Sequence, residues 1–533
     1  MTPNVAIHPN RLRRTNWLSR FTLLAYRKPG GPGRGNLSTV DIALGVLSVL
    51  SLGAACNGRQ VPTSDAIAPV EILSPTEPVT LDPRFATRAL DVKLTRLQHR
   101  GLVRLSPDTL EPVLDLAKHI ERDGALGLTI ELQPNQRFHS GTMLRPQDVC
   151  ATLEAVKDPL LLSPHRSIVA SFVNCRVRGL QTITLDMAEP RASFLTDLEL
   201  PILRADEAKT QERADGRLDG LGRFKVTSRT HEAVNLAPAF PGPGKKPRFS
   251  LVVRTIQDEN VRAMRLLSGK AEIAHNAFSP TLLSGFRDRN ITIHARPGAT
   301  VSYLLANCDL PPFDKPEFRR AISLAVDRKL ITQQLLGNYA RPAKWLIPEG
   351  HWAAAPNLPE LRYSRGQAAT TLSGHSEVLL LTSTDRSRLL QARAIAQMLS
   401  DAGLPTRAVP LELGLLLSRL DAGQFALAIL QIPEMTEPNI LRWFFHPRGI
   451  STPSEGRNRA RYRSPVAASL LDKASQEFDQ NARKALYFEL ARVMLEDMPV
   501  IPLWHEDQVV VERDRGAGFL PSAEGRWGAL AEL

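Results

Sequence analysis

The residue types that carry most enzyme chemistry occur in this chain without forming a catalytic motif. Twelve histidines and four cysteines are scattered over 533 residues. The sequence contains no GxSxG nucleophile elbow, no GxxxxGK(S/T) phosphate loop and no HExxH zinc motif. His505 precedes Glu506 and Asp507, but neighbouring residues on a strand point to opposite faces and do not form a charge relay. We therefore predict a binding protein with no catalytic residue, metal ligand or cofactor.

The cysteines are too far apart for a zinc site of the CxxC type. In an oxidising compartment Cys150 and Cys175 could pair, but two separate buried thiols are the interpretation that we favour from the sequence. Cys308 is expected to pack as a small apolar residue.

Residues 1–56 have the order of an export signal. Seven basic residues and one acidic residue in positions 1–55 account for +6 of the net charge of +12, and an apolar run over residues 42–55 follows. Gly53-Ala54-Ala55-Cys56 resembles a lipobox, in which Cys56 would carry a lipid and become the mature N-terminus. Gly53 stands where the usual Leu belongs, however, and the same small residues suit an ordinary signal peptidase. We predict a protein of the periplasm or cell envelope, with Cys56 as the candidate lipid anchor.

The rest of the chain has the composition of a globular protein with two or more lobes. Its length exceeds that of one ordinary core, and its 43% hydrophobic and 23% charged residues exclude a disordered chain. The remaining positive charge is diffuse and forms no basic stripe with interleaved aromatic residues, which argues against a nucleic-acid partner. No window is long and apolar enough to span a bilayer.

Residues 300–348 hold the most informative local pattern. An apolar run to residue 307 predicts a strand, and a Pro-Pro-Phe-Asp turn follows it. Asp314 is predicted to cap a helix that carries Pro316 in its first turn and Glu317 in a capping box. The helix should bury one stripe, made of Phe318, Ala321, Ile322, Ala325 and Val326.

A strand–helix–strand pattern covers residues 377–411. The apolar run at 378–381 is typical of a strand that is buried on both faces. Gly403 is the predicted C-cap of the following helix. Its predicted inner face consists of Leu390, Ala394, Met398 and Ala402.

The segment PPFDKPEFRRAISLAVDR…GNYARPA…IP resembles the signature of the family 5 extracellular solute-binding proteins, the oligopeptide-binding-like receptors of peptide and nickel importers. Similar motifs follow the family order from about residue 69 to residue 533. They include LDP at 81–83, QPNQRFHSG at 133–141, RTIQDENVRAMRLLSGKAEIA at 254–274 and NARKALYFELARVMLEDMPVIPLW at 481–504.

The resemblance implies a two-lobed α/β fold of the periplasmic-binding-protein type (type II, large peptide-binding subclass) with a hinge between the lobes. Lobe I would comprise residues 57–297 and 503–533, and lobe II residues 298–502. A peptide or peptide-sized solute would bind between the lobes and pass to an ABC permease with its ATPase subunits. The protein is expected to act as a monomer.

Family members hold the ammonium of a peptide with an aspartate in a segment similar to FALAILQIPEMTEP at 425–438. Here the place of that aspartate falls on Glu434 or Met435, depending on a one-residue gap. Glu434 in the cleft could pair with an ammonium, whereas Met435 in that place would argue against unmodified peptides. Glu434 and Glu437 could equally be solvated loop acids.

Three more residues are candidate ligand contacts by the same resemblance. Trp504 and His505 align near a cleft-lining aromatic residue of the family, and Tyr303 lies on a strand that crosses between the lobes; each could instead belong to the core or rim. Two alternative functions stay open: a degenerate relative that acts as a sensor or scaffold, and a receptor for a nickel chelate or an oligosaccharide. Six Trp and six Tyr are few for a receptor that stacks sugars. The sequence also supplies no His-rich cluster that would favour a nickel chelate.

Overall fold

The computed structural model describes residues 68–239, 246–286, 291–355, 357–452, 456–513 and 518–532. Residues 66–533 form one compact unit. The predicted signal and Cys56 lie outside the described residues. Within the described ranges, no helix combines the length and apolar composition needed to cross a membrane.

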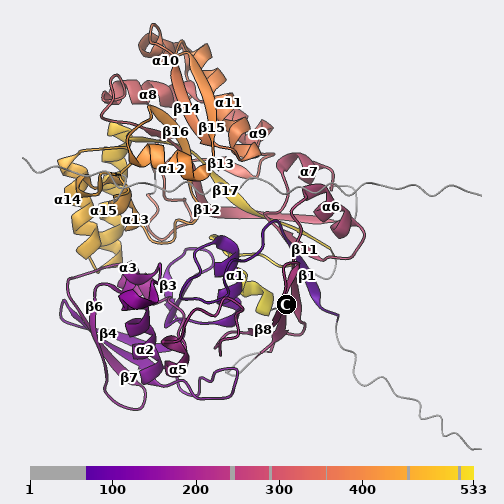
Figure 1. The fold of residues 1–533 in the computed structure, drawn as a ribbon. Helices are drawn as coiled ribbons and strands as arrows, with labels where there is room; N and C mark the ends of the chain where they lie inside the picture. Colours follow the sequence, from indigo (N-terminus) through magenta and orange to yellow (C-terminus); the bar gives the residue numbers. More distant parts are fainter. Residues whose placement is uncertain are drawn as a thin grey trace, which may run out of the picture. The chain divides into compact units, whose positions relative to one another are not determined.

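An eleven-stranded mixed sheet runs through this unit (Figure 1). Its strand order is β15 (Thr406–Leu411), β14 (Val378–Ser383), β16 (Leu427–Ile432), β12 (Thr292–Ala306), β17 (Val500–Glu512), β11 (Ile273–His275), β1 (Val70–Ser74), β10 (Leu251–Thr255), β9 (Ala233–Pro238) and β8 (Phe224–Arg229), with β13 (Ala340–Pro342) paired to β17 beside this path.

The two longest strands, β12 and β17, join the two ends of the sheet. They run antiparallel, and their register shifts between Arg296 and Thr300. Gly298 lies in this irregular stretch, where a β-carbon would stand 2.2 Å from the carbonyl oxygen of Glu506. Only glycine allows the two backbones to approach so closely at this point.

A smaller antiparallel sheet lies apart from the large one. Its strand order is β4 (Ala117–Asp123), β5 (Gly127–Leu132), β7 (Thr182–Met187) and β6 (Phe172–Val177), and a separate hairpin pairs β2 (Val103–Leu105) with β3 (Pro112–Leu114). Leu128, Ile130 and Leu132 alternate with more exposed residues along β5, as the period of a half-buried strand requires. Helix α2 (Pro146–Lys157) packs on this sheet.

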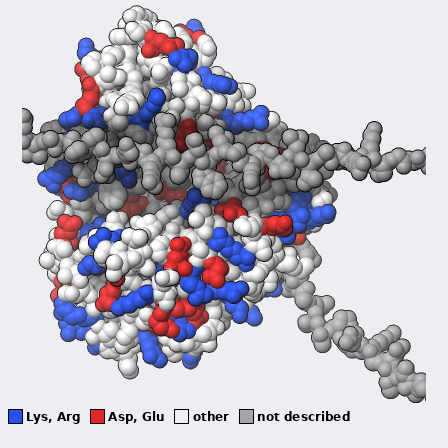
Figure 2. Space-filling model, viewed as in Figure 1, with Lys and Arg blue, Asp and Glu red and all other residues white. Residues whose placement is uncertain are grey.

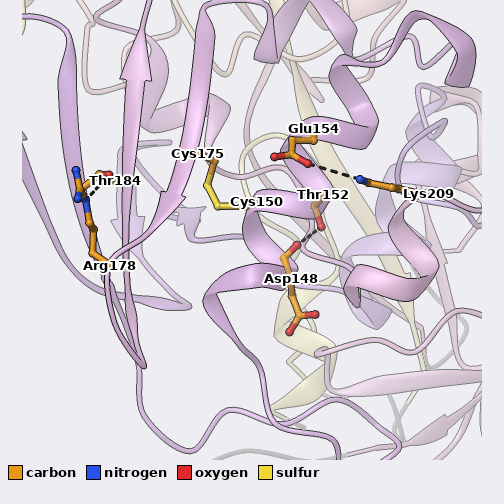
Figure 3. Close-up of a disulfide and its surroundings, with 8 residues drawn as sticks. All are labelled: Asp148, Cys150, Thr152, Glu154, Cys175, Arg178, Thr184 and Lys209. Carbon is orange, nitrogen blue, oxygen red and sulfur yellow. Dashed lines mark hydrogen bonds and ion pairs between the residues drawn. A yellow bond between two sulfur atoms is a disulfide. The ribbon is translucent and has the colours of Figure 1, made fainter.

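A disulfide bond between Cys150 and Cys175 fixes α2 to the edge strand β6 (Figure 3). Their α-carbons are 5.3 Å apart, a normal separation for a bridge. The interpretation of two separate thiols was therefore wrong. Sequence spacing alone did not show that helix and strand would pack with these two side chains facing each other.

The remaining helices cover the sheets (Figure 1). They are α1 (Ala89–Gln98), α3 (Arg166–Val169), α4 (Phe194–Asp197), α5 (Ala205–Ala208), α6 (Glu259–Leu267), α7 (Pro280–Ser284), α8 (Pro316–Ala325), α9 (Arg328–Gln334), α10 (Arg365–Leu372), α11 (Arg386–Asp401), α12 (Leu413–Asp421), α13 (Ile440–Phe445), α14 (Pro465–Gln476) and α15 (Gln480–Asp497), with short 3₁₀ turns at Pro159–Leu161, Pro447–Gly449 and Gly528–Ala531.

The buried stripe predicted for residues 318–326 is confirmed, but the cap is not. All five stripe residues are buried, in one apolar cluster with β14 and β17. The N-cap is Lys315, and no side chain there accepts a hydrogen bond from the helix. Because α8 begins at Pro316, the cap position falls one residue after Asp314.

The face predicted for α11 was also wrong in part. Leu390 is 51% exposed, whereas Ala392, Ile395 and Leu399 are buried. The inward face is therefore rotated relative to the predicted one, because Ile395 and Leu399 pack against the sheet. Gly403 follows the C-cap Ala402 with φ +90°, a left-handed conformation that favours glycine. Leu379 in β14 is 38% exposed, so that strand is not buried on both faces along its whole length.

Candidate ligand-binding cavity

A cavity of about 380 Å³ lies where three separate parts of the chain meet. Residues between positions 83 and 96 and between positions 165 and 201 form one wall, and residues between positions 434 and 443 form the other. Arg526, near the C-terminus, completes it. Its polar lining residues include Arg96, Arg191, Ser193, Thr196, Asp197, Glu199, Glu434, Thr436, Glu437 and Asn439.

Internal contacts hold α1 against this cavity. Leu94 and Leu97 are buried in an apolar cluster with β1 and β10, so the opposite side of the helix carries Arg96 toward the cavity. The segment before α1 is fixed by Arg84 and Asp82, which are almost fully buried and form an ion pair with a nitrogen–oxygen distance of 2.5 Å. Pro83, between them, lines the cavity.

The loop after β16 is anchored by Met435. Its side chain is fully buried in an apolar cluster, and its backbone N–H donates a 3.1 Å hydrogen bond to the carbonyl of Ala299. The hydroxyl of Thr300 donates to the carbonyl of Pro433. With both sides of the loop held, Glu434 faces the cavity and Met435 faces the core.

Glu434 is a partly buried carboxylate without a direct partner. Within the described part of the chain, no hydrogen bond or ion pair reaches it. Burial raises the pKa of this carboxyl, while the charges of Lys93 and Arg96 act in the opposite direction. Glu434 is therefore a carboxyl group that a ligand donor or cation could satisfy.

Glu437 is fully engaged. It forms an ion pair with Arg483, and it accepts hydrogen bonds from the hydroxyl of Thr196 at 2.9 Å and from the backbone of Asn439 at 3.0 Å. Glu437 is thus held in the cavity wall by its own protein partners, whereas Glu434 has no hydrogen-bond or ion-pair partner among the described residues. Neither matches a solvated loop acid.

Two neutral polar atoms of the lining also have no partner. The hydroxyl of Ser193 and the side-chain oxygen of Asn439 are inaccessible to solvent and make no hydrogen bond to any described residue. Ser193 is only 2% exposed. Buried polar groups are normally paired, so these two unpaired atoms are exceptions in the cavity wall.

A family model described as "Bacterial extracellular solute-binding proteins, family 5 Middle" matches residues 111–452, which is more than half of the chain. The chain belongs to this family. It is an extracytoplasmic solute-binding protein related to the receptors of ABC importers, as the sequence resemblance predicted.

Relatives and solved structures cover most of this solute-binding protein. Di/tripeptide-binding protein 2 of Pseudomonas aeruginosa (strain UCBPP-PA14) is 26% identical over 450 residues, 77% of this chain and 84% of the relative. The periplasmic binding protein DppA from Helicobacter pylori, in complex with the peptide STSA, superposes with a TM-score of 0.71 at 22% identity, over 87% of this chain and 97% of that one. NikA from Brucella suis, in complex with Fe(III)-EDTA, superposes with a TM-score of 0.77 at 17% identity. The superposition covers 86% of this chain and 98% of NikA. The two-lobed α/β fold is therefore confirmed.

The other predicted contact residues of this solute-binding protein lie outside the cavity lining. Trp504 is fully buried in an apolar cluster beneath α8. Tyr303 is buried in another cluster, and burial raises its pKa to about 12. His505 donates from Nε2 to the carbonyl of Trp345 at 2.9 Å, and burial lowers its pKa to about 4. Ligand contact by these three residues stays a prediction.

Sequence reasoning missed the wall opposite Glu434. Arg96, Glu199 and Arg526 carry no recognisable motif and lie more than 100 residues apart from one another. The only sequence signal was an arginine on the polar side of a short amphipathic helix, which usually indicates a solvated surface. No described group of three or more His, Cys, Asp or Glu residues could hold a metal ion.

Proposed function

We propose that this protein captures short peptides in the cavity and delivers them to an ABC permease with its ATPase subunits. The observation that carries the proposal is Glu434, an acidic side chain that faces the cavity and has no hydrogen-bond or ion-pair partner among the described residues. A free peptide ammonium would supply the missing hydrogen bonds. The relative named for di- and tripeptides supports this ligand class.

The size and the neutral polar groups of the cavity favour a short ligand. A volume of about 380 Å³ lies at the small end of typical ligand sites. Neutral polar side chains of the lining, such as Ser167 and Thr436, could bond the amide groups of a peptide. Such contacts recognise the backbone and leave side-chain identity less restricted.

We further propose that lobe I comprises residues 57–297 and 503–533 and lobe II residues 298–502. Both boundaries fall in the long paired strands, close to register irregularities at 296–300 and 302–303 of β12. Such a short irregular stretch can absorb the rotation of a hinge. In this proposal the lobes close around the peptide as a monomer, and Cys56 anchors the protein to the membrane if it carries a lipid.

The experiment is native mass spectrometry and calorimetry on residues 57–533 with a mixture of di- and tripeptides. We expect retained masses that match short peptides. Glu434→Gln should weaken binding about tenfold or more, because it removes the charge that pairs with the ammonium. Glu121→Gln, an exposed change on β4, is the matched control and should bind normally.

The proposal would be contradicted if the purified protein retained no peptide and bound none from the added mixture. It would favour a non-peptide receptor, as the complex of NikA with Fe(III)-EDTA illustrates for that relative. A folded protein that binds none of these ligands would favour a sensor or scaffold.

A further inference from the structure

We propose that Trp443 and Ile168 form an apolar subsite of the cavity, which makes the protein prefer peptides that carry one large apolar side chain. This inference rests on the proposed peptide function and deepens it, because it states which peptides bind best. Neither residue is among the ligand contacts predicted from the sequence.

Trp443 is an exception among the tryptophans of this protein. It is 54% exposed, whereas Trp345, Trp352, Trp504 and Trp527 are each at most 9% exposed. A large apolar side chain in water is informative when it borders a concave site, and Trp443 lines the cavity. A ligand group that covers the indole ring would remove this apolar surface from water and so gain affinity.

Helix α13 fixes the ring on the cavity side. Leu441 and Phe445 are four positions apart and are buried in one apolar cluster, which holds the helix against the core. Ile440 and Trp443 are three positions apart and therefore share another face of the helix. Both of them line the cavity, so this face of α13 presents apolar groups to a ligand.

The opposite wall presents apolar groups as well. Val169 of α3 is buried in the cluster of the four-stranded sheet, and Ile168 packs partly against it. His165 donates from Nε2 to the carbonyl of Ala86 at 2.9 Å, which ties α3 to the segment before α1. Ile168, Ala86 and Val92 all line the cavity. Helices α3 and α13 thus border the cavity from its two walls (Figure 1).

The charged lining residues on the first wall and at the C-terminus compensate one another. Arg526 pairs with Glu199, whose other oxygen lies 3.4 Å from Arg96. The groups around Trp443 and Ile168 therefore have to be satisfied by apolar contact. An aromatic ligand side chain would pack on the indole ring of one wall and on the aliphatic groups of the other.

A cationic side chain suits this place less well. An ammonium is attracted to the face of an indole ring, but the aliphatic groups on the opposite wall cannot replace its lost hydration. The subsite should therefore distinguish phenylalanine from lysine, although both side chains are long. Recognition of size alone would not make this distinction.

Calorimetry on residues 57–533 compares trialanine with the three tripeptides that carry one phenylalanine and the three that carry one lysine. We expect one phenylalanine peptide to bind at least about tenfold more tightly than trialanine, and the matching lysine peptide to show no such gain. Equal affinity for trialanine and all three phenylalanine peptides, or an equal gain from lysine, would overturn the subsite and leave the peptide function in place. If none of the seven peptides binds, the peptide function is overturned together with the subsite.

Variants assign the preference to the ring. Trp443→Ala should bring the affinity ratio of the phenylalanine peptide to trialanine close to one, and Trp443→Phe should keep most of the preference. Tyr363→Ala removes another exposed aromatic ring, which does not line the cavity, and should leave the ratio unchanged. A full preference in Trp443→Ala would overturn the assignment.

Tryptophan fluorescence gives a second measurement. Since the other tryptophans within residues 57–533 are buried, quenching by acrylamide should report mainly on Trp443. We expect the phenylalanine peptide to protect the emission from acrylamide in the unaltered protein, and this protection to be lost in Trp443→Phe. The same protection in both proteins would show that the peptide does not cover Trp443 and would overturn the subsite.

Discussion

The hydroxyl of Thr196 donates a 2.9 Å hydrogen bond to the carboxylate of Glu437, which joins segments 241 residues apart. The backbone N–H of Ala192 donates to the carbonyl of Ser475 at 2.9 Å in the same region. These bonds link the two sides of the cavity, so the structure represents a closed arrangement of its walls.

Thr196→Val should therefore weaken ligand binding. The variant removes one hydrogen bond to a charged acceptor that bridges the two walls, which is worth about 1.5 kcal/mol, or roughly tenfold in affinity. Calorimetry with a bound peptide measures the change. Thr370→Val removes a local bond within α10 and is the control, and an unchanged affinity in Thr196→Val would show that the bridge does not contribute to closure.

Phe478→Ala should also disfavour the closed arrangement. Phe478 precedes α15 but packs against the apolar cluster of the four-stranded sheet, with its ring 6.3 Å from that of Phe194. The guanidinium carbon of Arg122 lies 3.3 Å from the centre of the same ring. We expect a larger radius of gyration in solution scattering and weaker binding, whereas the exposed change Leu330→Ala should leave both unchanged.

Loss of the Cys150–Cys175 bridge should destabilise the protein. The cysteines are separated by 25 residues, for which the loss of chain restriction predicts about 3 kcal/mol. Urea unfolding of Cys150→Ala/Cys175→Ala against the unaltered protein measures the difference. Peptide affinity should persist, since neither cysteine lines the cavity, and Cys308→Ala controls for loss of a thiol.

Acid should destabilise the protein through buried His351. Its Nδ1 accepts the N–H of Ala353, its Nε2 donates to the carbonyl of Thr436, and burial lowers its pKa to about 4. The unfolded chain gains a proton below about pH 6.5 and the folded one only near pH 4, so stability falls across this window by on the order of 3 kcal/mol.

Urea unfolding of the unaltered protein and of His351→Gln between pH 7 and pH 4 tests this. The variant should lose less stability over the window than the unaltered protein does. The comparison is needed because Glu524, whose pKa burial raises to about 7, acts in the opposite direction. If the free energy of unfolding fell by the same amount in both proteins between pH 7 and pH 4, the assignment to His351 would be contradicted.

Gly298→Ala should distort the crossing strands. The new methyl group would stand 2.2 Å from the carbonyl oxygen of Glu506, so one backbone must move, at a cost of about 2–3 kcal/mol. Thermal unfolding measures the loss, and peptide affinity should fall with it if this stretch is the hinge. Gly366→Ala, where nothing lies within 4 Å, is the control and should be neutral or slightly stabilising.

Local patterns in the sequence determined much of the fold. The stripe of α8 and the strand–helix–strand order of residues 377–411 follow from side-chain periodicity and turn chemistry between near neighbours. Sequence motifs also indicated the family and the segment that contains Glu434. The predicted cap at Asp314 and the predicted helix face at Leu390 were wrong, because a shift of one residue or a fraction of a turn changes a cap or a helix face.

Only the tertiary structure decided which polar groups share a cavity. The pairing of Cys150 with Cys175, the choice between Glu434 and Met435, and the meeting of Arg96 with Arg526 all depend on how distant segments pack. Met435 faces the core because Ala299 and Thr300 hold its loop from another strand. Local sequence encodes periodicity and turns, whereas burial and charge compensation arise only when the long strands β12 and β17 bring the two ends of the sheet together.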